Sequence, residues 1–435
     1  MSSDWDCHKL SDVIVLISGG TPKTSIPEYW GGSIPWLSVA DFNTGYRWVR
    51  FAGKTITDRG VSESATVVLK KRDIIISARG TVGALAQLAK PMAFNQSCYG
   101  IRGKQGITDT DFVYYALRQA VTGMKQLAHG GVFDTITRDT FKIIDVRIPP
   151  LHEQRAIAHL LGSLDDRIAL LRDTNTTLEA IAQAMFKSWF VDFDPVHAKQ
   201  EGRDPEGMDA DTAALFPDSF EESELGLVPK GWNFSAVYDL AQYINGAAYR
   251  AFEPNSEGRG LPIIKIAELK AGVTSQTGFS DIKMPLKYKI NTRDILFSWS
   301  GNPDTSLDTF VWPYGEAWLN QHIFRVVPST DEKRSFVLLT LKYLKPVFAE
   351  IARNKQTTGL GHVTVSDLKR LRVVHPQNLL LQRWNELVDP LVERAFIVAQ
   401  QAQTLATIRD TLLPRLISGQ LRLPNAEEII EEATA

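Results

Sequence analysis

The sequence predicts an α+β protein built as an internal repeat, in which two mixed, mainly β domains are each followed by a long amphipathic helix. Three observations predict this fold class. Short motifs recur at a separation of about 227 residues. A helical pattern of apolar residues follows each set of motifs. Positive charge is concentrated in the two segments that carry the motifs.

The first domain is expected over residues 1–150. It contains 18 Lys and Arg against 13 Asp and Glu, a net charge of +5. Short apolar runs such as Ile74–Ser77, separated by Gly, Pro and Asn, predict strands, and Thr110–Leu127 has a helical pattern. The domain is therefore predicted to be mixed and mainly β.

The segment 151–195 predicts the first long helix. Its apolar positions follow one another at alternating steps of four and three, which is the seam of a coiled coil. A helix of some forty residues spans roughly 60 Å, so its seam needs a partner of similar length. An ordinary core helix remains an alternative, and the pair Asp165 and Asp166 is interpreted as a solvated helix face. The seam consists of Ile157, Leu161, Leu164, Ile168, Leu171, Asn175, Leu178, Ala182, Met185 and Trp189.

The segment 196–230 contains 3 Lys and Arg against 9 Asp and Glu, with Gly and Pro at intervals. This composition predicts a connector that is partly ordered at best. The second domain is expected over 231–376, which again has 18 basic and 13 acidic residues and a net charge of +5. Two equally basic domains separated by acidic segments fit two surfaces that bind a polyanion, although solvated surface charge is the simpler alternative.

The repeat is visible in matched motifs. Small changes of offset between the copies are what loop insertions and deletions produce in a duplicated unit. The matches are Ile34–Phe42 with Leu261–Leu269, Arg72–Gly80 with Arg293–Gly301, Phe94–Gln96 with Leu319–Gln321, and Ile136, Thr137, Phe141, Lys142, Val146 and Pro149 with Val363, Thr364, Leu368, Lys369, Val373 and Pro376.

The repeat extends to a second long helix over 377–420, followed by a tail over 421–435. Nine of the ten positions that correspond to the first seam are apolar or aromatic, and Arg409 is the exception. Pro390 predicts a kink or a late helix start, and Pro414 and Gly419 mark the end. The second seam consists of Trp384, Val388, Leu391, Ala395, Val398, Ala402, Leu405, Arg409, Leu412 and Leu416.

The sequence contains no recognisable catalytic or metal-binding motif. The glycine-rich nucleotide loops, the GxSxG elbow and the HExxH motif are missing, as are the signatures of adenine methyltransferases and of many nucleases. The histidines have no metal-ligand spacing, so no metal is expected. Only Cys7 and Cys98 are present, and no export signal or membrane segment is found, so a reducing cytoplasm is expected.

The polar residues that remain are suited to DNA. Arg, Asn and Gln side chains match the base edges of the major groove, and glycines allow the backbone to approach a phosphate. The alternative is that these residues form interior turns that both copies of the fold need. Residues that are alike in both copies are as likely to build this scaffold, whereas residues that read bases should differ if the two copies read different sequences. The candidates are Ser77, Arg79, Gly80, Asn95, Gln96, Gly130, Gly131, Ser298, Ser300, Asn320, Gln321, His322, Gly361 and His362.

A dozen motifs in order resemble those of a known family. The chain is similar to the specificity subunit of a type I restriction-modification system, and the resemblance covers essentially the whole sequence. The motifs include GGTP, EYW, IPWLSVADF, SARGTVG, IPPLHEQRAIAHLL, LDDRI, LEAIAQAMFKSWFVDFDP, PEGM, ELGLVPKGW, LNQHIF, GLGHVT and RDTLLPRLISG.

This resemblance implies two target recognition domains, each reading one half of a bipartite sequence in double-stranded DNA. It implies that the two long helices pack antiparallel as a coiled coil, with an internal pseudo-twofold repeat, and dock two methyltransferase subunits. The chain itself would have no catalytic activity or cofactor. S-adenosylmethionine and ATP would be bound by the modification and restriction subunits. One departure is that Leu381 and Gln382 stand where the first copy has Glu153 and Gln154, so the halves need not dock identically.

Two hypotheses follow. The long helices set the spacing between the half-sites, with the polar seam residue Asn175 as a candidate for fixing the helix register. The alternative function is a stand-alone DNA-binding or scaffold protein without methyltransferase partners.

Overall fold

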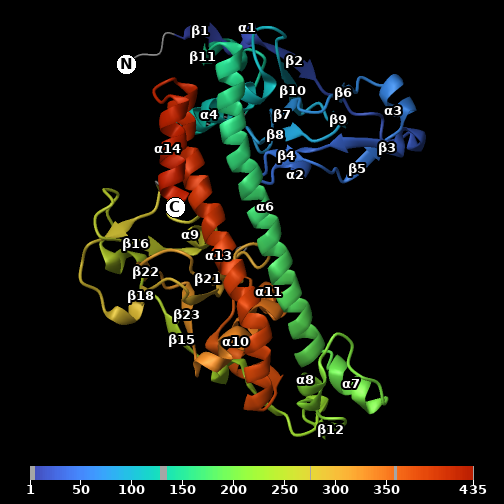
Figure 1. Ribbon diagram of the computed structural model, residues 1–435, viewed down its shortest axis with the longest axis vertical. Coiled ribbons are helices and arrows are strands. Elements are labelled where there is room, and N and C mark those ends of the chain that lie inside the picture. Colours follow the sequence, from blue (N-terminus) through green and yellow to red (C-terminus); the bar gives the residue numbers. More distant parts are fainter. Residues whose placement is uncertain (1–4, 128–134, 275, 357–359, 435) are drawn as a thin grey trace. The chain divides into compact units, whose positions relative to one another are not determined.

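The structure is a computed structural model that describes residues 5–127, 135–274, 276–356 and 360–434 (Figure 1). It divides into two compact units. Unit 1 consists of Met1–Leu171 and Gln401–Ala435, and unit 2 of Arg172–Gln400. Two helices of 40 residues each, α6 (Leu151–Phe190) and α13 (Asn378–Ile417), contribute to both units. Each unit combines short sheets with helices, so the predicted α+β fold class is confirmed.

Unit 1 contains a five-stranded sheet in the order β2-β10-β7-β8-β4, a four-stranded sheet in the order β5-β3-β9-β6, and the pair β1-β11. Its strands are β1 (Asp6–Lys9), β2 (Ile14–Ser18), β3 (Trp30–Leu37), β4 (Trp48–Val49), β5 (Lys54–Ile56), β6 (Val68–Leu69), β7 (Ile74–Ser77), β8 (Leu85–Leu88), β9 (Met92–Phe94), β10 (Cys98–Gly103) and β11 (Asp145–Ile148). Its shorter helices are α1 (Leu10–Val13), α2 (Val39–Phe42), α3 (Asp58–Ser62), α4 (Thr110–Leu127), α5 (Thr140–Ile143) and α14 (Leu423–Thr434).

Unit 2 contains two four-stranded sheets, β15-β23-β19-β21 and β17-β16-β22-β18, and the pairs β12-β13, β14-β25 and β20-β24. Its strands are β12 (Phe220–Ser223), β13 (Gly226–Pro229), β14 (Asn233–Ala236), β15 (Ala241–Asn245), β16 (Leu261–Ile264), β17 (Phe279–Ser280), β18 (Lys289–Ile290), β19 (Ile295–Ser298), β20 (Ser300–Gly301), β21 (Asp308–Val311), β22 (Ala317–Leu319), β23 (Ile323–Pro328), β24 (Gly361–His362) and β25 (Arg372–His375). Its shorter helices are α7 (Asp194–Gln200), α8 (Ala210–Ala214), α9 (Ile266–Ala271), α10 (Arg334–Tyr343), α11 (Lys345–Asn354) and α12 (Val365–Arg370).

The strand orders of the two larger sheets correspond between the units apart from the edge strand β4, which confirms the internal repeat. The order β2-β10-β7-β8 in unit 1 becomes β15-β23-β19-β21 in unit 2, and β5-β3-β9-β6 becomes β17-β16-β22-β18. Each unit also contains a two-stranded sheet, which is β1-β11 in unit 1 and β14-β25 in unit 2. A parallel contact also recurs, since β3 pairs with β9 and β16 with β22 in parallel.

The turn before the central strand is the same in both units. Arg72 and Arg293 adopt left-handed backbone conformations, with φ of 74° and 75°, which is uncommon for residues other than glycine. The next residue, Asp73 or Asp294, accepts a hydrogen bond from the backbone N–H three residues earlier. Both turns lead into strands whose four residues are all buried, β7 and β19. A repeated strained turn is strong support for a common origin of the two domains.

The seam positions predicted for α6 and α13 are all buried or half-buried. In unit 2 the end of α6 meets the start of α13, where the Trp189 and Trp384 ring centroids lie 5.3 Å apart. In unit 1 the start of α6 meets the residues just after α13, where Glu153 and Arg422 form an ion pair at 3.1 Å. The helices are therefore antiparallel within each unit, in agreement with the predicted coiled coil.

The expectation of a late start for the second helix is wrong. α13 begins at Asn378 and continues through Pro390 as one helix. Pro390 and Glu386, whose carbonyl group would otherwise accept the hydrogen bond that proline cannot donate, are both exposed. Water can bind that carbonyl on the outer face, so the helix tolerates proline there.

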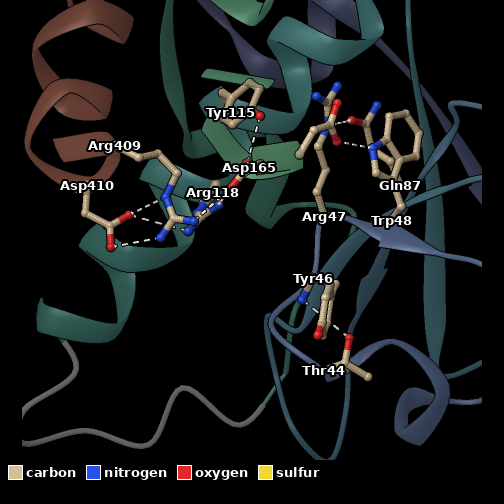
Figure 2. A network of polar contacts seen from close by, with 11 residues as sticks. Thr44, Tyr46, Arg47, Trp48, Gln87, Tyr115, Arg118, Asp165, Arg409 and Asp410 are labelled. Carbon is tan, nitrogen blue, oxygen red and sulfur yellow. Dashed lines mark hydrogen bonds and ion pairs between the residues drawn. The ribbon is translucent and has the colours of Figure 1, made fainter. Parts of the chain in front are cut away.

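Asp165 is not part of a solvated helix face, which corrects the prediction for the Asp165-Asp166 pair. It is 7 % exposed and lies against Arg409, which is 5 % exposed, with 2.6 Å between carboxylate and guanidinium. The Tyr115 hydroxyl donates a hydrogen bond to Asp165 at 2.8 Å, and Arg118 approaches from α4 (Figure 2). The charged seam residue Arg409 thus has a buried partner, because an unpaired buried charge would be strongly unfavourable.

Residues 196–230 form an ordered structure, which corrects the expectation of a partly ordered connector. They include most of α7, the short helix α8 and the hairpin β12-β13. Val196 and Phe216 are buried in the core of unit 2 together with Trp232, and the Trp189 and Phe216 rings meet edge to face at 5.1 Å. Aromatic anchoring therefore outweighs the acidic, Gly- and Pro-containing composition. None of the helices in the described ranges has the length and apolar character that a membrane span requires.

Candidate nucleic-acid interface

In unit 1, loops gather where β2 and β7 end and β10 begins. Because β10 lies between β2 and β7 and runs antiparallel to both, Ser18 lies opposite Tyr99 and Ser77 opposite Cys98. The loops that leave these strand ends carry polar side chains. Arg138 donates to the Ser18 hydroxyl at 2.8 Å, and the Thr21 hydroxyl donates to the Gln96 side chain. The first loop cluster is defined as Ser18, Thr21, Arg79, Gln96 and Arg138.

In unit 2, the corresponding strand ends form a second cluster. Asn245 lies opposite Phe324 and Ser298 opposite Ile323. The Trp299 indole N–H donates to the Asn245 side-chain oxygen at 3.2 Å, and the Trp299 and His322 rings are 5.7 Å apart. Ser300 pairs with His362 across β20-β24. The second loop cluster is defined as Asn245, Trp299, Ser300, Gln321, His322 and His362.

Asn95 and Asn320 build the turn beneath each cluster. The Asn95 side-chain oxygen accepts from the Ser97 N–H at 3.0 Å, and that of Asn320 accepts from the His322 N–H at 3.4 Å. A glycine packs against each turn, since a Cβ atom on Gly19 or Gly246 would lie 2.2 Å from the Asn95 or Asn320 carbonyl oxygen. The two asparagines therefore support the turn, which agrees with the alternative that treated them as scaffold residues.

Ser77 and Ser298 are fully buried, which corrects their selection as DNA-contacting residues. The Ser77 hydroxyl donates to the Thr81 carbonyl and accepts from the Ala84 N–H, so it closes a turn. Gly361 is also buried, and a Cβ atom there would lie 2.2 Å from the Ala352 carbonyl oxygen. These three residues shape the loops from beneath and do not face solvent.

The other candidates reach the surface of the clusters. Arg79, Gly80, Gln96 and His362 are exposed, and Ser300, Gln321 and His322 are half-buried. Gly130 and Gly131 lie outside the described residues. Arg79 has no hydrogen bond or ion pair with any residue that the structure describes, so its guanidinium group is available to a ligand.

Five cluster members were not identified from the sequence. Ser18, Thr21, Asn245 and Trp299 lie at strand ends or in loops whose sequence gave no chemical signal. Arg138 is the fifth. Its position next to the repeated Thr137 was the available signal, because the Ile136 N–H bonds to the Ala78 carbonyl and places this segment beside Arg79.

The loop that carries His362 is supported by a buried carboxylate. Asp367 accepts hydrogen bonds from Lys355 at 2.5 Å, from the Thr364 hydroxyl at 2.6 Å and from the Thr364 N–H at 2.7 Å. Burial alone would raise the pKa of Asp367, but the hydrogen bonds from Lys355, Thr364 and Arg370 outweigh it and hold the pKa well below its usual range. Asp367 is therefore ionised at neutral pH and caps α12 next to the second loop cluster.

The chemistry of both clusters suits contacts to base edges. The first cluster brings together guanidinium, amide and hydroxyl groups, and the second brings together imidazole, indole, amide and hydroxyl groups. All of these groups donate or accept hydrogen bonds in the plane of a base. Within the described ranges, no three His, Cys, Asp or Glu side chains are placed to share a metal ion.

The family of the chain follows from comparison with known proteins. Residues 2–180 and 229–378 match the model of the type I restriction modification DNA specificity domain. The two matched segments cover both globular domains and most of α6, and they repeat the division seen in the strand orders. The chain belongs to this family, and it recognises DNA sequence as the specificity subunit of a type I restriction-modification system. Specificity subunits of these systems are non-catalytic, so the chain is not an enzyme.

Relatives extend over nearly the whole chain. The type I restriction enzyme MjaIX specificity subunit of Methanocaldococcus jannaschii is 28 % identical over 429 residues, covering 97 % of this chain and 94 % of that protein. The HindI specificity subunit of Haemophilus influenzae is 26 % identical, covering 68 % and 72 %. The crystal structure of the S subunit from M. genitalium has a TM-score of 0.53 at 17 % identity and covers 95 % and 96 % of the chains, so the fold is shared.

Proposed function

We propose that the chain reads a bipartite target in double-stranded DNA, with domain 1–150 reading one half through the first loop cluster and domain 231–376 reading the other through the second. The observation that carries this proposal is that the two clusters lie at equivalent strand ends of two equivalent sheets, β2-β10-β7 and β15-β23-β19. Each domain also carries a net charge of +5, which favours binding to a polyanion.

The long helices would set the distance between the half-sites. α6 and α13 are each continuous through residues of both units, and their seams are buried or half-buried throughout. Paired helices of this kind are stiff, so half-sites would be bound together only at a set spacing and rotational phase. Asn175 donates to Glu179 on its own helix at 3.3 Å, whereas Arg409 pairs with Asp165 on the other helix. Arg409 therefore replaces Asn175 as the candidate for fixing the register.

Methylation and cleavage would be supplied by partners. Two methyltransferase subunits would dock on the helices and bind S-adenosylmethionine, and restriction subunits would use ATP. Such a complex would act on DNA in the cytoplasm. Co-expression of this chain with modification subunits of a type I system tests this directly. Copurification supports the proposal, and a chain that binds DNA but never retains these subunits would favour the stand-alone alternative.

Domain exchange tests whether each domain recognises its own half of the target. Replacing residues 1–150 with the same domain of a relative should change one half of the methylated motif and leave the other half and the spacer unchanged. The matched exchange of residues 231–376 should change the opposite half. Methylated adenines mapped across the genome of the expressing cell provide the readout. Altered sequence in both halves after one exchange would contradict the proposal.

A heptad insertion tests the spacing. One heptad added to α6 within Leu171–Met185, with a second at the corresponding part of α13, keeps both seams in phase and lengthens the pair by roughly 10 Å. The tolerated spacer should change in length while both half-sites keep their sequence. Seven residues added at the exposed turn of the β12-β13 hairpin are the control and should leave the spacer unchanged. An unaltered spacer after the double insertion would refute the proposed role of the helices.

A further inference from the structure

The backbone beneath the two loop clusters is the same. In unit 1 the Ala78 N–H donates to the Ser97 carbonyl at 2.8 Å, and the Ala78 carbonyl accepts from the Ile136 N–H at 2.9 Å. In unit 2 the Trp299 N–H donates to the His322 carbonyl at 3.3 Å, and the Trp299 carbonyl accepts from the Val363 N–H at 2.8 Å. Equivalent positions can therefore be compared directly.

The side chains on this common backbone differ in kind. The first cluster has the guanidinium groups of Arg79 and Arg138 where the second has Ser300 and Val365. The second cluster has aromatic rings where the first has small residues. These pairs are Trp299 with Ala78, His322 with Ser97, and His362 with Thr135. The repeated residues Asn95 and Asn320 hold the turns, so the differing residues are the ones free to distinguish two half-sites.

Trp299 is positioned to contact a base. It is half-buried, one part of its ring system packs near His322 and Phe324, each with its ring centroid 5.7 Å away, and its N–H is held by Asn245 at 3.2 Å. The ring is thus fixed by contacts on its inner side while its remaining surface reaches solvent. His322 Nδ1 is buried and has no hydrogen-bond partner among the described residues, which leaves a polar atom unsatisfied at the same place.

We propose that the two domains read DNA by different chemistry, and that Trp299 is the specificity-determining residue of the second. The first domain reads guanine through Arg79, with Arg138 beside it. The second reads its half-site through the indole of Trp299, which contacts an apolar base face or thymine methyl group, with His322 and His362 alongside. The inference rests on the proposed function and assigns the residues and base classes within it.

The chemistry of each group sets the expected effect. A guanidinium binds the O6 and N7 of guanine with two hydrogen bonds, and loss of such a pair costs about tenfold or more in discrimination against other bases. An indole has no acceptor and offers a broad apolar face, so it discriminates by contact with methyl groups or base faces. Removal of the ring should therefore relax recognition at an A·T pair or an unstacked step, and leave the guanine position untouched.

Exchange of the equivalent residues tests the inference in the complex with modification subunits. Trp299→Ala introduces the residue of the first domain, and Arg79→Ser that of the second. Methylation mapping should show relaxed sequence in one half-site for Trp299→Ala and loss of a guanine preference in the other half-site for Arg79→Ser, each by about tenfold or more at a single position. Phe234→Ala, an exposed aromatic change on β14 away from the cluster, should leave both half-sites unchanged.

Trp299→Phe separates a base contact from a folding defect. Phenylalanine keeps an aromatic face but cannot donate to Asn245, so it should retain most of the specificity that alanine loses. The inference would be overturned if Trp299→Ala left the motif unchanged or altered both half-sites. In either case a bipartite motif for the wild-type complex would show that the proposed function still holds. A wild-type complex that methylates no bipartite motif would instead overturn the proposed function.

Discussion

Cys98 shows how completely the first loop cluster is closed from below. It begins β10 opposite Ser77 and is 1 % exposed, and burial raises the pKa of its thiol to about 12. The thiolate is the reactive form, so both access and ionisation are blocked. Cys7 is exposed on β1 and provides the comparison within the same chain.

We therefore expect one reactive thiol in the native protein and two after denaturation. Iodoacetamide at neutral pH should label Cys7 at the rate of a free thiol and Cys98 only through local opening, at least a hundredfold more slowly than in denaturant. Mass spectrometry of the peptides distinguishes the two sites, and Cys7→Ser serves as the control with no rapid labelling. Rapid labelling of Cys98 in the native chain would show that the strand ends beneath the cluster are open.

Whether a residue is the same in both copies distinguishes residues that build the fold from residues that could contact DNA. The type of the residue distinguishes them less well. Asn95 and Asn320 are suited to adenine, yet both fold a turn. Arg79 and Trp299 lie on equivalent backbone segments of the two units, and each differs from its counterpart, which is Ser300 for Arg79 and Ala78 for Trp299. The sequence predicted strand β7 with its exact bounds because strands and glycine turns are local patterns. Local patterns could not identify Trp299, since only the hydrogen bond to Asn245 and the contact with His322, both distant in sequence, give it a role.

At the scale of the elements, the buried ion pair of unit 1 has an apolar counterpart in unit 2. Asp165 and Arg409 correspond through the repeat to Val392 and Ala182. Ala182 is buried and Val392 half-buried, and both line a cavity of about 160 Å³ between α6, α13, α10 and β21. In unit 1 the two long helices are therefore joined by a buried ion pair at this position, and in unit 2 the equivalent position has apolar side chains. Removing one partner of a buried ion pair is strongly destabilising, whereas replacing the whole pair by apolar residues is often close to neutral.

Exchange of the ion pair for its counterpart tests this distinction. Arg409→Ala alone leaves Asp165 buried beside Tyr115 and Arg118 without its closest cation, and should cost about 3 kcal/mol of unfolding free energy. The triple variant Asp165→Val, Arg409→Ala, Tyr115→Phe removes the ion pair together with the tyrosine hydroxyl, while Arg118 keeps its ion pair with Asp410. It should therefore cost clearly less than the single change. Urea unfolding of the full chain, followed by tryptophan fluorescence, provides the measurement. A triple variant less stable than Arg409→Ala would show that the pair is itself strongly stabilising.

Periodicity predicted the helices because an apolar repeat of three and four residues is a property of local sequence. It could not predict the partner of Arg409. Arg409 is the one charged residue in the seam of α13. Its partner Asp165 lies one position away from the seam of α6, so the sequence pattern predicts an exposed residue there. The prediction for the connector 196–230 was wrong for a related reason. Its acidic composition suggested disorder, whereas Phe216 is anchored beside Trp232 in a core that only the folded chain assembles.

At the scale of the whole molecule, charge and repetition act together on binding. If both domains bind one DNA molecule, as proposed, the second contact is intramolecular, so a target with both half-sites would gain affinity without any new kind of contact. Each bound domain would also release counterions from the phosphates it neutralises, and the slope of log K against log salt would add over the contacts made.

The salt dependence of binding should therefore report how many domains are engaged. For the complex with modification subunits, a duplex with both half-sites at the native spacing should bind at least a hundredfold more tightly than a duplex with one half-site scrambled, and with a steeper salt slope. Lengthening the spacer by about five base pairs rotates one half-site to the opposite side of the helix, so affinity and slope should fall to the values of the single half-site. Fluorescence anisotropy over a series of salt concentrations measures both. Equal slopes for the bipartite and single-site duplexes would mean that only one domain binds at a time, and the helices would then have no part in selecting the target.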